Sequence, residues 1–154
     1  MHLFFVENIK YLANVMGYNI EVSFNVLKHN IHETQDLIIT IALENGCETY
    51  YSDYEFEKNL RYNRNHCVFT FIFQDYNIDD IVKFLKKMKT LKGIYIESIC
   101  DNDTNKMLFA SSLYVSQWMD KYIAKVYKMN KRERSYSEDD IKILNTIQKL
   151  KCSS

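Results

Sequence analysis

Residues 18–26 read Tyr-Asn-Ile-Glu-Val-Ser-Phe-Asn-Val, and this stretch decides how the chain folds. Apolar and polar side chains alternate along it, which is the period-two pattern of a β-strand with one face in a core and the other in water. The pattern therefore predicts a half-buried strand. On its N-terminal side, residues 3–16 carry apolar side chains at helical spacing and stop before Gly17, so they predict a helix.

Further strands are predicted on the C-terminal side of this stretch. Residues 37–43 are apolar on both faces except at Thr40, which is typical of a central strand, and residues 44–46 then supply a turn into a hairpin strand over 48–56. Residues 66–73 carry apolar side chains in both phases of the alternation, so they predict a strand that is buried on both faces.

The C-terminal half of the chain is predicted to hold three helices and one hairpin. Asn77 can cap a helix that runs to about residue 89, because its first turn is acidic and its last turn is rich in lysine. Ser137 opens a capping box with Asp140 ahead of a final helix. The hairpin is expected over 94–100 and 106–110, and the remaining helix over 115–129.

Together these elements predict a single α+β domain over residues 1–154, since they follow one another without an internal repeat or a linker. The expected architecture is a mainly antiparallel, mixed sheet with helices packed on one face and a C-terminal αα-hairpin. The apolar phase of each element should form the core. The residues expected there are Val22, Phe24, Ile39, Ile41, Phe69, Phe71, Ile81, Leu85, Ile96, Met119 and Val126.

The composition favours a soluble intracellular protein. Lys plus Arg and Asp plus Glu both total 20, so no overall field attracts nucleic acid or an anionic membrane. The apolar run before Glu7 is too short for a signal peptide, and no stretch approaches the roughly 20 apolar residues of a membrane span. The four cysteines show no close pairing. We therefore expect reduced thiols, no membrane association and a location in the cytoplasm of the producing or host cell.

Amino-acid usage in the chain is skewed toward residues with A/T-rich codons. Proline is absent, only three glycines occur, and Asn, Ile, Tyr and Phe are abundant. Together with the charged segment 127–140, this composition resembles proteins of unassigned function from large A/T-rich DNA viruses. The resemblance implies no activity, and a protein of an A/T-rich protist or bacterium would have the same composition.

One segment resembles part of a calcium-binding loop. Asp101, Asp103 and Asn105 match the first three ligand positions, where alternating oxygens converge on the cation. The pattern then fails, because Lys106 stands at the glycine position and Ser112 at the position of the bidentate glutamate. A polar hairpin turn explains the same residues.

Zinc ligands and catalytic motifs are also scarce. His29, His32, His66 and Cys67 are residue types that bind zinc, but no Cys-x-x-Cys accompanies them, and His66 and Cys67 should point to opposite faces of a strand. The chain contains no phosphate-binding glycine loop, no nucleophile elbow and no dinucleotide fingerprint. We therefore expect no metal, no cofactor and no motif-based active site.

Two regions are candidate binding surfaces. A basic segment interleaved with tyrosines could bind phosphates, although a solvated helix face would have the same charges. Its cationic residues are Lys121, Lys125, Lys128, Lys131, Arg132 and Arg134. A tyrosine-rich hairpin could form a protein interface, although helices packed on the sheet could cover it. Its tyrosines are Tyr50, Tyr51, Tyr54 and Tyr62.

These observations predict a non-enzymatic protein-interaction or structural module, which the resemblance places among viral proteins. Its tyrosine-rich surface would contact a protein partner or a second copy of the chain. The alternative is a nucleic-acid-associated protein that uses the basic segment 121–134. A third reading is a small enzyme whose carboxylates act without a recognisable motif.

Overall fold

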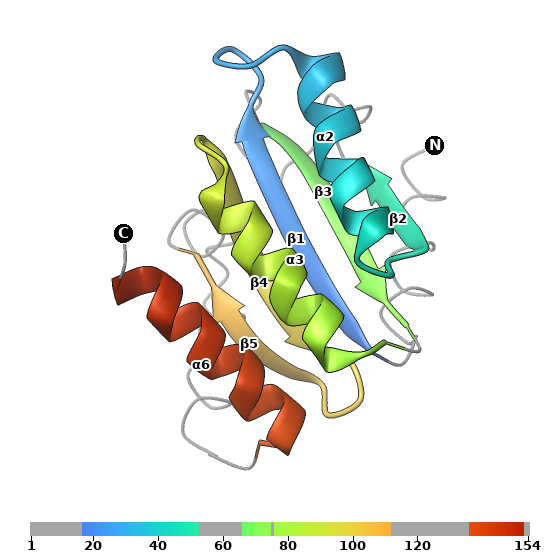
Figure 1. Ribbon diagram of the computed structural model, residues 1–154, viewed down its shortest axis with the longest axis vertical. Coiled ribbons are helices and arrows are strands. Elements are labelled where there is room, and N and C mark those ends of the chain that lie inside the picture. Colours follow the sequence, from blue (N-terminus) through green and yellow to red (C-terminus); the bar gives the residue numbers. More distant parts are fainter. Residues whose placement is uncertain (1–16, 53–65, 75, 112–135, 153–154) are drawn as a thin grey trace.

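The computed structural model describes residues 17–52, 66–74, 76–111 and 136–152. Its elements, shown in Figure 1, are β1 (Tyr18–Asn25), α2 (Ile31–Glu44), β2 (Thr49–Ser52), β3 (His66–Phe73), α3 (Ile78–Thr90), β4 (Ile94–Asp101), β5 (Lys106–Ala110) and α6 (Glu138–Cys152). The helices predicted over 3–16 and 115–129 lie outside the described residues, and so does the first half of the predicted αα-hairpin.

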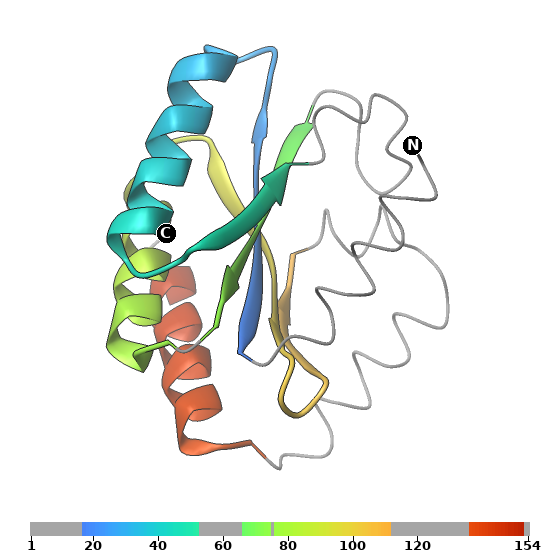
Figure 2. The same cartoon turned by 90° about the vertical axis from the view of Figure 1, so that its right-hand side faces the viewer.

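The strands form one sheet in the order β2-β3-β1-β4-β5, and every described pairing is antiparallel. The three described helices all lie on one face of this sheet (Figure 2). The α+β class, the antiparallel sheet and the one-sided packing of the described helices are therefore confirmed.

The core lies between the sheet and these helices. Phe24, Phe71 and Leu85 are fully buried there, and the Phe71 and Phe84 rings meet edge to face with centroids 5.5 Å apart. Most of the predicted core is confirmed as buried: Val22, Phe24, Ile41, Phe69, Phe71, Ile81, Leu85 and Ile96. Ile39 only packs against the cluster in a partly buried position, and Met119 and Val126 lie outside the described residues.

Several element predictions are confirmed residue by residue. β3 matches the predicted strand over 66–73, and it is buried on both faces as expected. Asn77 caps α3, since its side-chain oxygen accepts a hydrogen bond from the backbone N–H of Asp79 at 2.9 Å. β4 and β5 form the predicted hairpin.

The strand predicted over 37–43 is wrong, because these residues belong to helix α2. Asn30 caps this helix by accepting a hydrogen bond from the N–H of Glu33 at 3.2 Å. An apolar run this short fits a buried strand or a buried helix equally well, and only the cap distinguishes them. The predicted hairpin turn is also wrong: Gly46, with φ of +90°, follows the end of α2, and β2 pairs with β3 instead.

The prediction that β1 is half-buried is wrong as well. Its polar phase is covered too, since Glu21 is 8% exposed and Ser23 is fully buried. β1 is the central strand, and the face of the sheet opposite the described helices also buries Thr70 and Glu97. On that face the Ser23 hydroxyl and the Glu97 carboxylate are hydrogen-bonded to each other, which lowers the cost of burying them.

Candidate functional site

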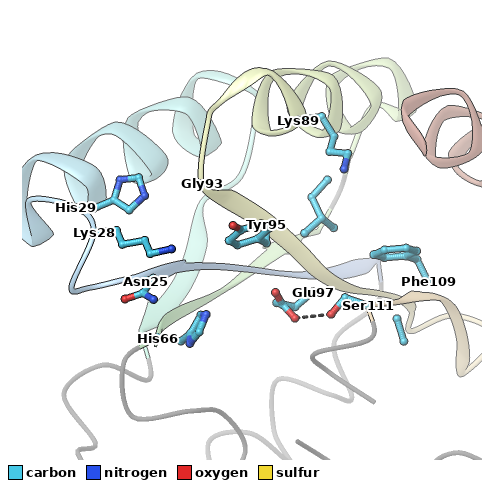
Figure 3. Close-up of a pocket in the computed structure, with 12 residues that line it drawn as sticks. Asn25, Lys28, His29, His66, Lys89, Gly93, Tyr95, Glu97, Phe109 and Ser111 are labelled. Atoms are coloured by element: carbon cyan, nitrogen blue, oxygen red, sulfur yellow. Dashed lines mark hydrogen bonds between the residues drawn. The ribbon is translucent and has the colours of Figure 1, made fainter. Parts of the chain in front are cut away.

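A pocket of about 580 Å³ opens at the end of the sheet where β1 finishes and β4 begins (Figure 3). Its described lining comes from five parts of the chain: the end of β1 with the loop behind it, the start of β3, the last turn of α3, the start of β4 and the end of β5. Because it gathers segments that are far apart in sequence, this pocket is the main candidate for a binding site.

The pocket runs alongside a part of β4 that β5 does not reach. β5 pairs with β4 only from Ser98 to Asp101, and a bond from the Ser111 N–H to the Glu97 carbonyl, at 2.8 Å, extends this pairing by one residue. Among the described residues, no strand pairs with Ile94–Ile96 on the β5 side of β4. We call this stretch the open edge.

The direction of the backbone groups at the open edge follows from the pairing of β1. The Gly17 carbonyl accepts a hydrogen bond from the backbone N–H of Asn102, so this carbonyl points toward β4. Backbone groups alternate in direction along a strand, so the N–H and C=O of Ser23 point toward β4 too. Tyr95 lies opposite Ser23, so the backbone N–H and C=O of Tyr95 point toward β1. The N–H of Ile96 lies across the peptide bond from the C=O of Tyr95, so it points away from β1 and toward the open edge.

Glu97 lies on the inner wall of the pocket, and its side chain is only 1% exposed. It is the extra residue of a β-bulge, since Val22 lies opposite Ile96 and Glu21 lies opposite Ser98. Its two carboxylate oxygens accept hydrogen bonds from hydroxyl groups.

The first donor is the Ser23 hydroxyl, which is 2.8 Å from Oε1 of Glu97. The second is the Ser111 hydroxyl, which is 2.5 Å from Oε2 and is drawn in Figure 3. These two bonds compensate for the burial of the carboxylate and join β1, β4 and the end of β5.

His66 lies at the start of β3 and also lines the pocket. Its Nδ1 atom is buried and has no hydrogen-bond partner among the described residues. Burial lowers the pKa of His66 below its ordinary value of 6.5, although the negative charge of Glu97 opposes this effect. His66 therefore offers a mostly neutral imidazole with one unused polar atom.

The mouth of the pocket is cationic. Lys28, from the loop after β1, and Lys89, from α3, both line it (Figure 3). His29 stands beside them and packs on Gly93, where a Cβ atom would lie 2.5 Å from its Nε2 atom. Gly93 has a φ of +78°, so both the backbone and this close contact require glycine.

The chain on both sides of Lys89 is also basic. The segment 81–96 contains lysines at 83, 86, 87, 89 and 92 and no acidic residue. Neither Lys28 nor Lys89 has an ion-pair or hydrogen-bond partner within the part of the chain that the structure describes. Their charges are therefore available to a ligand.

A second polar cluster lies at the opposite end of β1. The Tyr18 hydroxyl donates to Oδ1 of Asp140 at 2.6 Å, and the Ser137 N–H donates to Oδ2 at 3.3 Å. The Asp140 N–H donates back to the Ser137 hydroxyl at 3.1 Å, which completes the predicted capping box. Asp140 is fully buried, so α6 is fixed to the sheet at this point.

Asp101 completes this cluster from the end of β4. Its Oδ1 atom accepts bonds from the N–H groups of Asp103, at 2.9 Å, and Thr104, at 3.4 Å, and its carboxyl group can donate a bond to Asp140 when it is protonated. Burial, reinforced by Asp140, raises the pKa of Asp101 to about 6. Asp101 therefore holds the hairpin turn, as the turn interpretation of the calcium-like motif predicted.

The predicted binding surfaces are only partly described. Tyr50 is 40% exposed on the edge strand β2, and its ring lies 6.0 Å from that of Phe71 on β3. Tyr51 is partly buried. The remaining predicted site residues lie outside the described residues: Tyr54, Tyr62, Lys121, Lys125, Lys128, Lys131, Arg132 and Arg134.

The residues whose side chains could bind zinc do not form a metal site in the described ranges. His29 and His66 both line the pocket, whereas His32 is exposed on α2. Within the described residues, no group of three or more His, Cys, Asp or Glu side chains could hold a metal ion. Cys47, Cys67 and Cys100 are free thiols.

Sequence reasoning missed the pocket itself. Glu97 carried a usable signal, since it is a charged residue inside the otherwise apolar predicted strand 94–100. Lys28 and Lys89 carried no sequence signal of this kind, because they line one pocket only as a result of how the loop after β1 is placed relative to α3.

None of the described helices has the length and apolar character needed to cross a membrane. Comparison with protein families, curated proteins and solved structures found no match to this chain.

Proposed function

We propose that this chain is a non-enzymatic protein-interaction module that binds an extended segment of a partner protein along the open edge of β4. The observation that carries the proposal is that β5 stops short of Ile94–Ile96 while a pocket runs beside that stretch. Strand edges with unpaired N–H and C=O groups bind extended peptides by adding a strand to the sheet.

The local geometry suits this mode of binding. The N–H of Ile96 points outward, and the main chain of an added strand would accept a hydrogen bond from it. The side chains of an added strand would alternate between the two faces, and the pocket could receive one set of them. Tyr95 is 52% exposed beside this edge and offers a large amphipathic contact surface.

Selection from a random peptide library tests the proposal on the full chain without knowledge of the natural partner. Synthetic versions of the selected peptides should bind with dissociation constants in the micromolar range. Binding should shift the amide resonance of Ile96 and slow its hydrogen exchange, because that N–H gains a partner.

N-methylation of the peptides supplies the control. In an added strand, only alternate peptide N–H groups face β4, so methylation of these should abolish binding and methylation of the others should not. The absence of any binding peptide, or equal effects of methylation at all positions, would contradict the proposal. If the chain is a dimer in gel filtration and a selected peptide converts it to a monomer, the chain associates with itself through the same edge.

A second proposal, nucleic-acid binding, is favoured by the lysines of α3 and by the basic segment 121–134. Its test is the salt dependence of oligonucleotide affinity. The logarithm of the binding constant should fall linearly with that of the salt concentration, and replacement of Arg132 and Arg134 should reduce the slope. No affinity for DNA or RNA at low salt would contradict it. The small-enzyme reading and the viral resemblance stay predictions.

A further inference from the structure

We propose that the segment bound at the open edge carries an acidic side chain, which lies between Lys28 and Lys89 in the pocket. This inference rests on the proposed function and names the chemical class of the partner. The two lysines come from different elements, and both line the pocket beside the open edge (Figure 3).

The charges inside the pocket favour an anion. Glu97 is the acidic residue in the described lining, and it is buried and hydrogen-bonded to Ser23 and Ser111. Lys28 and Lys89 have no described partner of their own. A carboxylate entering with a peptide would therefore meet two ammonium groups that no described residue binds, and charge-assisted hydrogen bonds are stronger than neutral ones.

An acidic peptide fits these observations better than a nucleic acid does. A strand edge alternates N–H donors and C=O acceptors, which matches another main chain, whereas a phosphate backbone could use only the donors. His66 supports the same view, since its unpartnered Nδ1 atom lies on the pocket wall and could bond to a side chain or main chain brought there.

Three matched peptides test the inference: acetyl-Thr-Val-Xaa-Val-Thr-amide with Glu, Gln or Lys at the central position. Their affinities for the wild-type chain would be measured by fluorescence titration at low salt. We expect the Glu peptide to bind about tenfold more tightly than the Gln peptide, and the Lys peptide to bind most weakly. The preference should decrease as salt is raised.

Two double variants show where the preference arises. In Lys28→Gln/Lys89→Gln, the Glu peptide should lose its advantage over the Gln peptide. In the control Lys83→Gln/Lys87→Gln, which removes the same charge from residues of α3 that are not among the described pocket lining, the advantage should remain. A preference that survives in the first variant would overturn the inference.

The possible failures are distinguishable. If all three peptides bind equally and shift the Ile96 amide, the acidic partner is wrong and the proposed function stands. If none of the three peptides binds at millimolar concentration, both the acidic partner and the proposed function are wrong. If the Gln peptide matches the Glu peptide while Lys28→Gln/Lys89→Gln weakens binding of a single-stranded oligonucleotide, the lysines serve nucleic acid and the inference is overturned.

Discussion

Both ends of β1 carry buried carboxylates, but the surroundings of these groups differ. At the Tyr18 end, which we call the closed end, Asp140 accepts hydrogen bonds from Tyr18 and from the backbone of Ser137, and it interacts with Asp101. At the Asn25 end, which we call the open end, Glu97 accepts bonds from two serines and lines a pocket whose two lysines have no partner among the described residues.

One buried carboxylate serves the fold, and the other lies beside a candidate binding site. At the closed end, the polar atoms are used to join α6, β1 and the β4–β5 turn, so the charge serves the fold. At the open end, the carboxylate is satisfied while Lys28, Lys89 and Nδ1 of His66 have no described partner. Groups left in this state next to a pocket are better explained by a ligand than by folding.

The largest effect is expected at the closed end. Asp140→Ala should lower the free energy of unfolding by about 2–4 kcal/mol, because it leaves the Tyr18 hydroxyl and the N-terminus of α6 without their acceptor. Asn145→Ala, at an exposed position of the same helix, should change it by less than about 0.5 kcal/mol. Denaturant unfolding measures both, and equal effects would show that the cluster does not support the fold.

The second prediction concerns pH. The pKa of Asp101 is raised from 3.8 to about 6, so the folded protein binds this proton more tightly than the unfolded chain does. The contribution of protonated Asp101 to the free energy of unfolding is therefore fully present below about pH 4, and it is lost as the pH rises through 6.

Asp101→Asn resembles the protonated side chain, since its amide can donate to Asp140 while its oxygen accepts from the turn. The variant should match the wild type near pH 4 and exceed it by about 2–3 kcal/mol near pH 7.5. Unfolding curves at several pH values test this, and a difference between the two proteins that does not vary with pH would refute it.

A smaller effect is expected from the cap of α6. Ser137→Ala should cost about 0.5–2 kcal/mol, because the N–H of Asp140 loses its acceptor. Ser137→Asp should restore most of this loss, since aspartate is an equally good cap. Thermal unfolding at constant pH is the measurement. An alanine variant as stable as the wild type would mean that the hydroxyl does not hold the helix.

The smallest effect on stability is expected at the open end. Lys28→Gln/Lys89→Gln should change the free energy of unfolding by less than about 0.5 kcal/mol, because neither lysine has a described partner to lose. The same variant should nevertheless lose its preference for an acidic peptide. A large loss of stability would mean that these lysines support the fold, and the contrast between the two ends would disappear.

The closed end could be predicted in part from sequence. Ser137 and Asp140 form a capping box, which is a local pattern, and its geometry is confirmed. Tyr18 could not be assigned to it, because the hydroxyl and Asp140 are 122 residues apart in the chain. Local signals also predicted β3, the cap of α3 and the β4–β5 hairpin correctly.

The open end could not be predicted from sequence. Its existence depends on a difference in length between β4 and β5 and on a bulge at Glu97, and neither leaves a periodic signal. The error at α2 has a related cause: the apolar run in 37–43 hides its helical period, and the cap at Asn30 appears only in the structure. Long-range pairing decides both features.

Residue-resolved amide hydrogen exchange of the free protein tests the central claim most directly. The claim is that Ile94–Ile96 presents an unpaired strand edge, with the N–H of Ile96 pointing outward and that of Tyr95 pointing to β1. We predict that the Ile96 amide exchanges faster than the Tyr95 amide by at least about two orders of magnitude. Equal strong protection of both amides would mean that the edge is already paired in the free protein, and it would contradict the proposed binding site.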